Sequence, residues 1–191
     1  MKTAVIYGSV RGARQGIKCA RFVCRMFEKR GHEVTLVDPL EFDLPLLDKM
    51  YKEYESGQAP PAMERLAEIY RGSDAFVFVT AEYNHSVPPA LLNLIDHFMG
   101  EFFWRPAGIV SYSAGSFGGV RAGVHLRAVL GEVGLITVPS MVPLSKVRDS
   151  FNEEGQDQTG NYERRIQKFI DELEWYAGAL GAAREKGVPY S

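Results

Sequence analysis

The opening of the chain joins a short apolar run to a polar loop and then to an amphipathic helical pattern. Residues 4–7 form the apolar run, the loop contains Ser9, Arg11 and Arg14, and helical spacing begins near Gln15. A continuous apolar run is typical of a parallel strand that is buried on both faces. The order strand, loop, helix therefore predicts an α/β fold with parallel strands.

The same alternation continues along the chain. Further strand-like runs lie at residues 32–37, 74–80, 107–113 and 135–139, and helical spacing lies at residues 17–29, 62–70, 90–99, 120–133 and 162–180. Five strands alternating with five helices predict a parallel sheet with helices on both faces. In the strand order 2-1-3-4-5, the loops after strands one, three and four line one crevice, which is where such sheets bind ligands.

Length and composition narrow the class of protein. The 191 residues fit a single domain, residues 1–191. No apolar run is long enough to span a membrane, and we expect no signal peptide before the first strand, so we expect a cytoplasmic protein without a membrane partner. The net charge of −2 argues against nucleic-acid binding. Cys19 and Cys24 have neither redox nor metal-site spacing, so we expect them to be packing residues and expect no metal site.

The first loop has the composition of a site for one phosphate group. A helix start offers free backbone N–H groups, and a hydroxyl and two arginines add donors and charge. The candidate residues are Ser9, Arg11, Arg14, Gln15 and Gly16. The alternative is a surface turn with solvated arginines. Because the loop lacks the G-x-G-x-x-G pattern, we interpret Asp38 as a turn residue at a strand end rather than a ribose ligand.

The second and third unusual loops suit a flat heteroaromatic ring. Tyr83 offers an aromatic face and Asn84 an amide, while Glu82 either orients this loop or pairs with a basic residue across a subunit contact. The third loop is small enough for close backbone approach, and its candidate ring contacts are Ser113, Gly115, Ser116 and the wall residue Phe117. A packing tyrosine and an ordinary glycine-serine turn are the alternatives. Phosphate at one end and a ring at the other describe a mononucleotide such as FMN.

These loops resemble those of the NADPH-dependent FMN reductase family, which has a flavodoxin-like fold. The resemblance is carried by Gly8-Ser9-x-Arg11-x-x-Arg14-x-Gly16, Glu82-Tyr83-Asn84-x-Ser86-x-Pro88 and Ser113-Ala114-Gly115-x-x-Gly118-Gly119-x-Arg121. It implies a flavodoxin-like three-layer sandwich, bound FMN, an NAD(P)H donor, and homodimers or homotetramers whose interface closes the flavin site. This chain departs from many members at Pro89 and Leu92, where they have glycine and lysine, and at Arg14, where others have serine.

The expected activity is a two-step oxidoreduction, from NAD(P)H through FMN to a small acceptor: a quinone, free flavin, azo compound or metal oxyanion. The chemistry belongs to the flavin, so no catalytic side chain is expected, and His85 is a possible substrate contact. One alternative is an electron-carrier flavoprotein without a nicotinamide site. Another is a flavodoxin-like interaction module without a cofactor.

Four further expectations concern the surface. We expect the long connection at residues 39–61 to be functional or a partner surface. Residues 102–104, Phe-Phe-Trp, together with the predicted helix at residues 90–99, should be exposed and covered by another subunit. Residues 149–159 should form a mobile loop, and the tail after Gly181 should fray.

Overall fold

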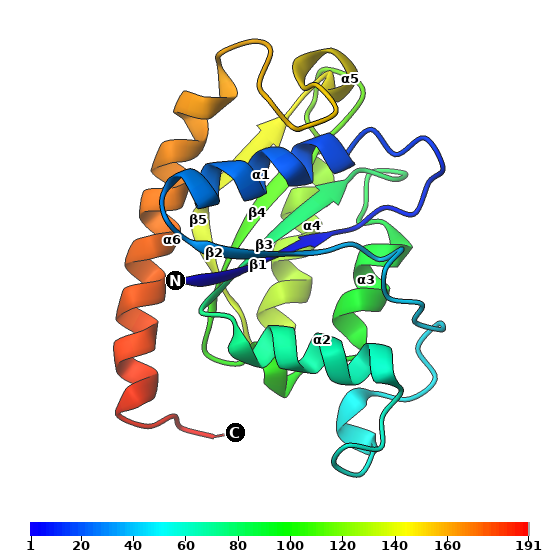
Figure 1. Cartoon of the computed structure of the whole chain (residues 1–191), viewed down its shortest axis with the longest axis vertical. Helices are drawn as coiled ribbons and strands as arrows, with labels where there is room; N and C mark the ends of the chain where they lie inside the picture. The colour runs from blue at the N-terminus through cyan, green and yellow to red at the C-terminus, as the bar shows by residue number, and fades with distance from the viewer. Residues whose placement is uncertain (191) are drawn as a thin grey trace.

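The computed structural model describes residues 1–190 and contains one five-stranded parallel sheet (Figure 1). Its strands are β1 (Lys2–Tyr7), β2 (Glu33–Val37), β3 (Ala75–Ala81), β4 (Pro106–Tyr112) and β5 (Ile136–Leu144). They pair in the order β2-β1-β3-β4-β5, which confirms the predicted topology. All residues of the central strands β3 and β4 are buried, as expected from their largely apolar sequences.

Helices cover both faces of the sheet, which confirms the three-layer arrangement (Figure 1). On one face lie α1 (Ile17–Lys29) and α6 (Tyr162–Glu185), and on the other lie α2 (Pro61–Gly72), α3 (Pro89–Asp96) and α4 (Val120–Glu132). A one-turn helix, α5 (Val147–Ser150), follows β5. Short 3₁₀ segments lie at η1 (Tyr51–Glu53) and η2 (Gly100–Phe102).

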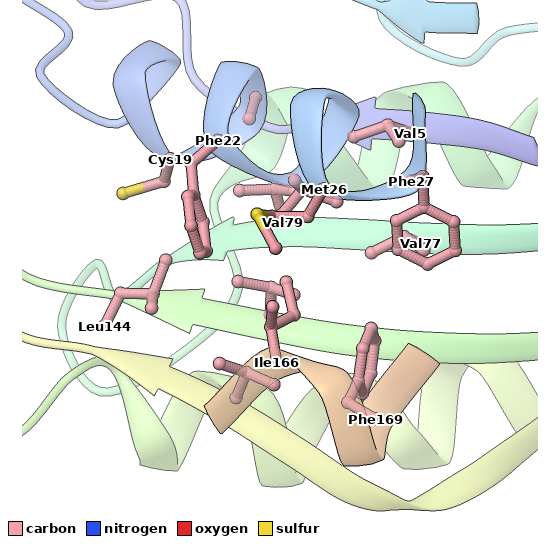
Figure 2. Packing of buried hydrophobic residues seen from close by; sticks show 14 of the residues in the cluster. Val5, Cys19, Phe22, Met26, Phe27, Val77, Val79, Leu144, Ile166 and Phe169 are labelled. Atoms are coloured by element: carbon pink, nitrogen blue, oxygen red, sulfur yellow. The ribbon is translucent and has the colours of Figure 1, made fainter. Parts of the chain in front are cut away.

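The alternation of side chains along each strand divides the core into two layers. Val77 and Val79 point toward α1 and α6 (Figure 2), whereas Phe76 and Phe78 belong to the layer on the opposite face. Close helix packing also depends on Gly108 in β4, because a Cβ there would lie 2.3 Å from Cζ of Phe169. The two packed layers provide a rigid support for the loops at the strand ends.

The fifth strand is longer than its sequence suggested. We predicted an end at Pro139, but β5 continues to Leu144 and is irregular opposite Ala107 and Ile109 of β4. Proline lacks a backbone N–H and is tolerated at sheet edges and bulges, so Pro139 does not end this edge strand. The extension brings α5 to the same edge of the sheet as the other predicted ligand-binding loops (Figure 1).

Residues 149–159 and the start of the tail after Gly181 are more ordered in structure than their sequences suggested. Residues 149–159 are held by a β-bridge between Phe151 and Asp157 and by an ion pair of 2.8 Å between Lys18 and Glu153. Helix α6 runs past Gly181 to Glu185. Asp157 accepts hydrogen bonds from the first amides of α6, which is the usual way to stabilise a helix start.

The predicted exposed aromatic segment is covered by the chain itself. Phe102 is fully buried, and the ring of Trp104 lies 4.7 Å from that of Tyr190, centroid to centroid. The Trp104 indole N–H also donates a 2.9 Å hydrogen bond to the Tyr190 carbonyl. The C-terminal segment thus covers the aromatic part of the surface that we had assigned to a second subunit.

Two smaller predictions can be compared with the structure. Cys19 is buried and Cys24 partly buried, which confirms both as packing residues, and burial raises the pKa of the Cys24 thiol to about 12. Within residues 1–190 no helix is long and apolar enough to cross a membrane.

Candidate functional site

A pocket of about 360 Å³ lies at the carboxyl edge of the sheet, where the predicted loops meet. Its volume is within the range of small-molecule sites. The predicted residues that line it are Ser9, Arg11, Arg14, Gln15, Gly16, Glu82, Tyr83 and Ser113. Asn84, His85, Gly115, Ser116 and Phe117 do not line it and are exposed on the adjacent loops.

The first loop brings a polar surface to one end of this pocket. The Ser9 hydroxyl is 3.0 Å from the Tyr83 hydroxyl, so the first and second loops are joined directly. Gly16 is required at its position, because a Cβ there would lie 2.0 Å from Cζ of Tyr112. Gln15 Oε1 is buried without a hydrogen-bond partner among the described residues. Since buried polar atoms are normally paired, this acceptor oxygen lacks a hydrogen-bond donor.

The two arginines of the first loop have different surroundings. Arg14 forms an ion pair with Asp38, donates to the Ser9 carbonyl at 3.4 Å, and lies 5.6 Å from the centroid of the Tyr7 ring. The hydrogen bond to Asp38 raises the pKa of the Arg14 guanidinium. Arg11 is exposed and takes part in none of the ion pairs between residues 1–190. The Arg11 charge is therefore available to an anion, whereas that of Arg14 is already balanced.

Asp38 makes more contacts than a turn residue at a strand end requires. Its carboxylate accepts a 3.0 Å hydrogen bond from the Leu40 amide, which confirms the predicted turn. The same carboxylate pairs with Arg14, as described above. Asp38 thereby joins the end of β2 to the first loop.

The second loop is a tight hairpin turn. Tyr83 and Ser86 exchange backbone hydrogen bonds of 3.0 and 2.9 Å, and Asn84 and His85 between them have φ values of +50° and +65°. Positive φ at both central residues defines the turn that suits twisted antiparallel strands. Asparagine and histidine are among the non-glycine residues that adopt this conformation most often, so the sequence of the turn suits its backbone. The His85 side chain is exposed.

Glu82 joins the second loop to the start of α4 in the same chain. Its carboxylate accepts hydrogen bonds from the Arg121 guanidinium at 2.9 Å and from the Arg121 amide at 3.1 Å. Burial raises the pKa of Glu82, but the hydrogen bonds from Arg121 and the Ala122 amide outweigh that effect, so the pKa is below its ordinary value. Glu82 therefore holds the second loop against α4 within the chain, which favours the first of the two alternatives.

The third loop is held in its conformation by hydrogen bonds of its own Ser113 side chain. The Ser113 hydroxyl donates to the Gly115 carbonyl and accepts from the Gly118 amide, both at 2.9 Å. Gly119 has a φ of +71°, and a Cβ there would lie 2.6 Å from the Tyr112 carbonyl, so only glycine fits. The amides of residues 115–117 donate to no backbone carbonyl of the described chain. This loop offers amide N–H groups, rather than the Ser113 hydroxyl, to a ligand.

Tyr112 and α5 are parts of the pocket that sequence reasoning missed. The additional lining residues are Ala13, Ala81, Tyr112, Ala114, Val147 and Arg148. Burial raises the pKa of both Tyr7 and Tyr112, whose hydroxyls are 3.4 Å apart, so both remain neutral donors beneath the first loop. The apolar continuation from residue 141 to 144 was the signal that could have placed α5 at this edge.

Comparison with known proteins agrees with this geometry. Residues 1–149 match the family described as NADPH-dependent FMN reductase. The chain belongs to this family. It is 38% identical over 182 residues to a quinone reductase from Pseudomonas putida, a match covering 89% of this chain and 91% of the relative. It is 35% identical over 184 residues to a probable NADPH:quinone oxidoreductase from Oryza sativa, covering 91% of this chain and 90% of the relative.

Solved structures support the same fold. The flavoenzyme FerB of Paracoccus denitrificans, an NAD(P)H:(acceptor) oxidoreductase, superimposes with a TM-score of 0.75 at 24% identity, covering 94% of this chain and 98% of FerB. A flavodoxin mutant from Pseudomonas aeruginosa gives a TM-score of 0.54 at 20% identity, covering 95% of this chain and 99% of the flavodoxin. The fold is therefore flavodoxin-like. As a member of its family, the chain is an oxidoreductase that uses FMN and NAD(P)H.

Proposed function

We propose that the pocket at the carboxyl edge binds FMN and that the enzyme passes electrons from NAD(P)H to a quinone. The observation that carries the proposal is the exposed Arg11, which takes part in no ion pair within residues 1–190 and lies in a pocket shared by the three loops. Arginine side chains and helix N-termini are the groups that bind phosphate in proteins. The residues present therefore fit a flavin mononucleotide.

The proposed binding residues divide between the two ends of the cofactor. Those for the phosphate are Ser9, Arg11, Arg14, Gln15 and Gly16. Those for the ring are Glu82, Tyr83, Asn84, Ser113, Gly115, Ser116 and Phe117, in which Glu82 acts by holding the second loop against α4. The amides of residues 115–117 are available to stabilise negative charge at the ring edge.

Bound FMN supplies the hydride and electron chemistry. The chain binds and orients it, and the exposed second and third loops leave room for the nicotinamide and then the acceptor. His85 lies on the exposed turn, where we propose that it contacts substrate. A quinone is our preferred acceptor because several relatives are named quinone reductases. Free flavins, azo compounds and metal oxyanions are the other acceptors to test.

We further propose that the chain acts as one domain, residues 1–191, in a cytoplasmic homodimer or homotetramer without nucleic-acid or membrane partners. A groove of about 550 Å³ beside α3 supports an oligomer. Leu40 and Leu46 in this groove are 58% and 82% exposed, and both belong to the long connection at residues 39–61. Exposed apolar side chains gathered at a groove are typical of protein interfaces.

The experiment is anaerobic titration of the FMN-reconstituted protein with NADPH, followed by addition of a benzoquinone. We expect loss of the visible flavin absorption with NADPH and its return with the quinone. An electron carrier without a nicotinamide site would not be reduced by NADPH, and a protein without a cofactor would remain colourless after incubation with FMN. Either result would contradict the proposal.

A matched pair of variants tests the binding residues. Replacing both Arg11 and Arg14 with alanine should weaken FMN binding by several kcal/mol, since charge-assisted hydrogen bonds contribute about 1.5–3 kcal/mol each. Replacing the exposed Arg164 and Arg165 of α6 removes the same charge outside the pocket and should leave FMN affinity unchanged. Equal FMN affinity in the two double variants would contradict the assignment of the first loop.

A further inference from the structure

A third arginine faces the pocket from the segment after β5. Arg148 lies on α5 and lines the same pocket as Arg11, although more than a hundred residues separate the two in sequence. Arg148 is exposed and takes part in no ion pair between residues 1–190. The pocket is therefore lined by two arginines without an ion-pair partner, Arg11 and Arg148. The remaining arginine, Arg14, is already paired with Asp38.

The backbone holds α5 in this place. The Lys146 amide donates to the Gly115 carbonyl at 3.0 Å, and the Val147 amide donates to the Ser113 carbonyl at 3.3 Å. The Val147 side chain is buried, and the Ser150 hydroxyl donates to the Ser145 carbonyl at 3.0 Å. These contacts fix the position of the short helix relative to the third loop, so Arg148 approaches the pocket from an anchored segment.

The backbone before α5 also carries strain. Lys146 has a φ of +50°, which is uncommon for a residue with a Cβ. Such conformations persist where surrounding contacts impose them, and they gather at ligand sites. In this chain the strained residue is the one whose conformation turns β5 into α5 and directs the following residues toward the pocket.

We propose that Arg148 is a cationic ligand of the FMN 5′-phosphate and acts together with Arg11. The inference rests on the proposed binding of FMN in this pocket. A phosphate with two negative charges is satisfied best by two unpaired guanidinium groups, and Arg14 offers less because it shares its charge with Asp38. Arg148 and Arg11 thus divide the task that the first loop alone was expected to perform.

The test compares FMN with riboflavin, which has the same ring but no phosphate. Dissociation constants are measured by quenching of flavin fluorescence in the wild type, Arg148→Ala and Arg148→Lys, with Arg164→Ala as a charge-matched control outside the pocket. We expect Arg148→Ala to weaken FMN binding about tenfold or more and to leave riboflavin binding unchanged. Arg148→Lys should retain part of the FMN affinity, and Arg164→Ala should retain all of it.

Several results would overturn the inference. These are unchanged FMN affinity in Arg148→Ala, equal losses for FMN and riboflavin, or a higher KM for NADPH with unchanged FMN affinity, which would assign Arg148 to the nicotinamide nucleotide. If Arg148→Ala does not fold, the ratio of FMN affinity to riboflavin affinity in Arg148→Lys is compared with that of the wild type. An unchanged ratio would overturn the inference. Failure of the wild type to bind either flavin would instead contradict the proposed function itself.

Discussion

Two arginines at opposite ends of the sheet show how this chain separates folding from binding. Arg105 precedes β4 and donates to four backbone carbonyls, those of Arg71, Ser73, Glu101 and Phe103, at distances between 2.8 and 3.2 Å. Arg11, at the carboxyl end, is exposed and without an ion pair among the described residues. Both side chains end in a guanidinium group. That of Arg105 is hydrogen-bonded within the protein, whereas that of Arg11 has no ion-pair partner among the described residues.

The same contrast extends to the surrounding segments. At the amino end of the sheet, the C-terminal tail packs on Trp104, and Arg184 donates to its carbonyl at 2.9 Å. At the carboxyl end, Gln15 has an unpaired buried oxygen, and Asn84, His85 and Lys146 have positive φ. Trp104 at the amino end also has a positive φ, of +63°, but three of the four non-glycine residues with positive φ in the described chain lie at the edge where ligands bind in such sheets.

The largest effect should follow removal of the satisfied arginine. We expect Arg105→Ala to lower the free energy of unfolding by about 3 kcal/mol, because several partly buried carbonyls lose a charged donor together. FMN affinity of the folded protein should not change. Urea unfolding and flavin titration measure the two quantities. A stability change no larger than that of Arg164→Ala would break the comparison.

Removal of the free arginine should give the opposite pattern. Arg11→Ala should weaken FMN binding by about 2 kcal/mol, the contribution of a charge-assisted hydrogen bond to phosphate. Its unfolding free energy should stay within about 0.5 kcal/mol of the wild type, as for other surface substitutions. The same two measurements apply. Lower stability with unchanged FMN affinity would assign Arg11 a structural task.

The Glu82–Arg121 pair should make stability depend on acid pH. The pKa of Glu82 is lowered in the folded state, so its stabilising effect is present above the unfolded-state pKa and is lost as pH falls through the lower folded-state value. Glu82→Gln should therefore cost about 1 kcal/mol at neutral pH and less as the pH falls below about 4. Urea unfolding across this range measures the difference. If the difference in unfolding free energy between the wild type and Glu82→Gln stays constant with pH, the charge of Glu82 does not contribute to stability.

The smallest effect concerns the tail at the amino end. Tyr190→Ala should lower stability by about 0.5–1 kcal/mol through loss of the contact with Trp104. The emission of Trp104 should also shift, and a Trp175→Phe background isolates it, because the chain has two tryptophans. Unchanged stability and emission would show that the tail does not pack there in solution.

Much of the fold could be predicted from local pattern. The strand sequences at β1, β3 and β4 are largely apolar, and the predicted strand order was the one that brings the three unusual loops to one crevice. The prediction for β5 was too short because Pro139 was taken as a strand end, whereas an edge strand tolerates proline. Cover of Trp104 by Tyr190 depends on contacts between distant residues, which no local pattern reports.

The site was predicted less completely than the fold. Motif spacing identified the three loops, but it could not show that Arg14 is balanced by Asp38 or that Ser113 is occupied within its own loop. Those facts depend on where side chains meet after folding. Arg148 was missed because it reaches the pocket only when β5 extends to Leu144.

The most direct test of the central claim is a crystal structure of the protein soaked with FMN. The account predicts density in the pocket at the carboxyl edge, with the phosphate against residues 9–16 and the ring between the loops at residues 82–86 and 113–119. An empty pocket, or flavin density elsewhere on the molecule, would contradict it.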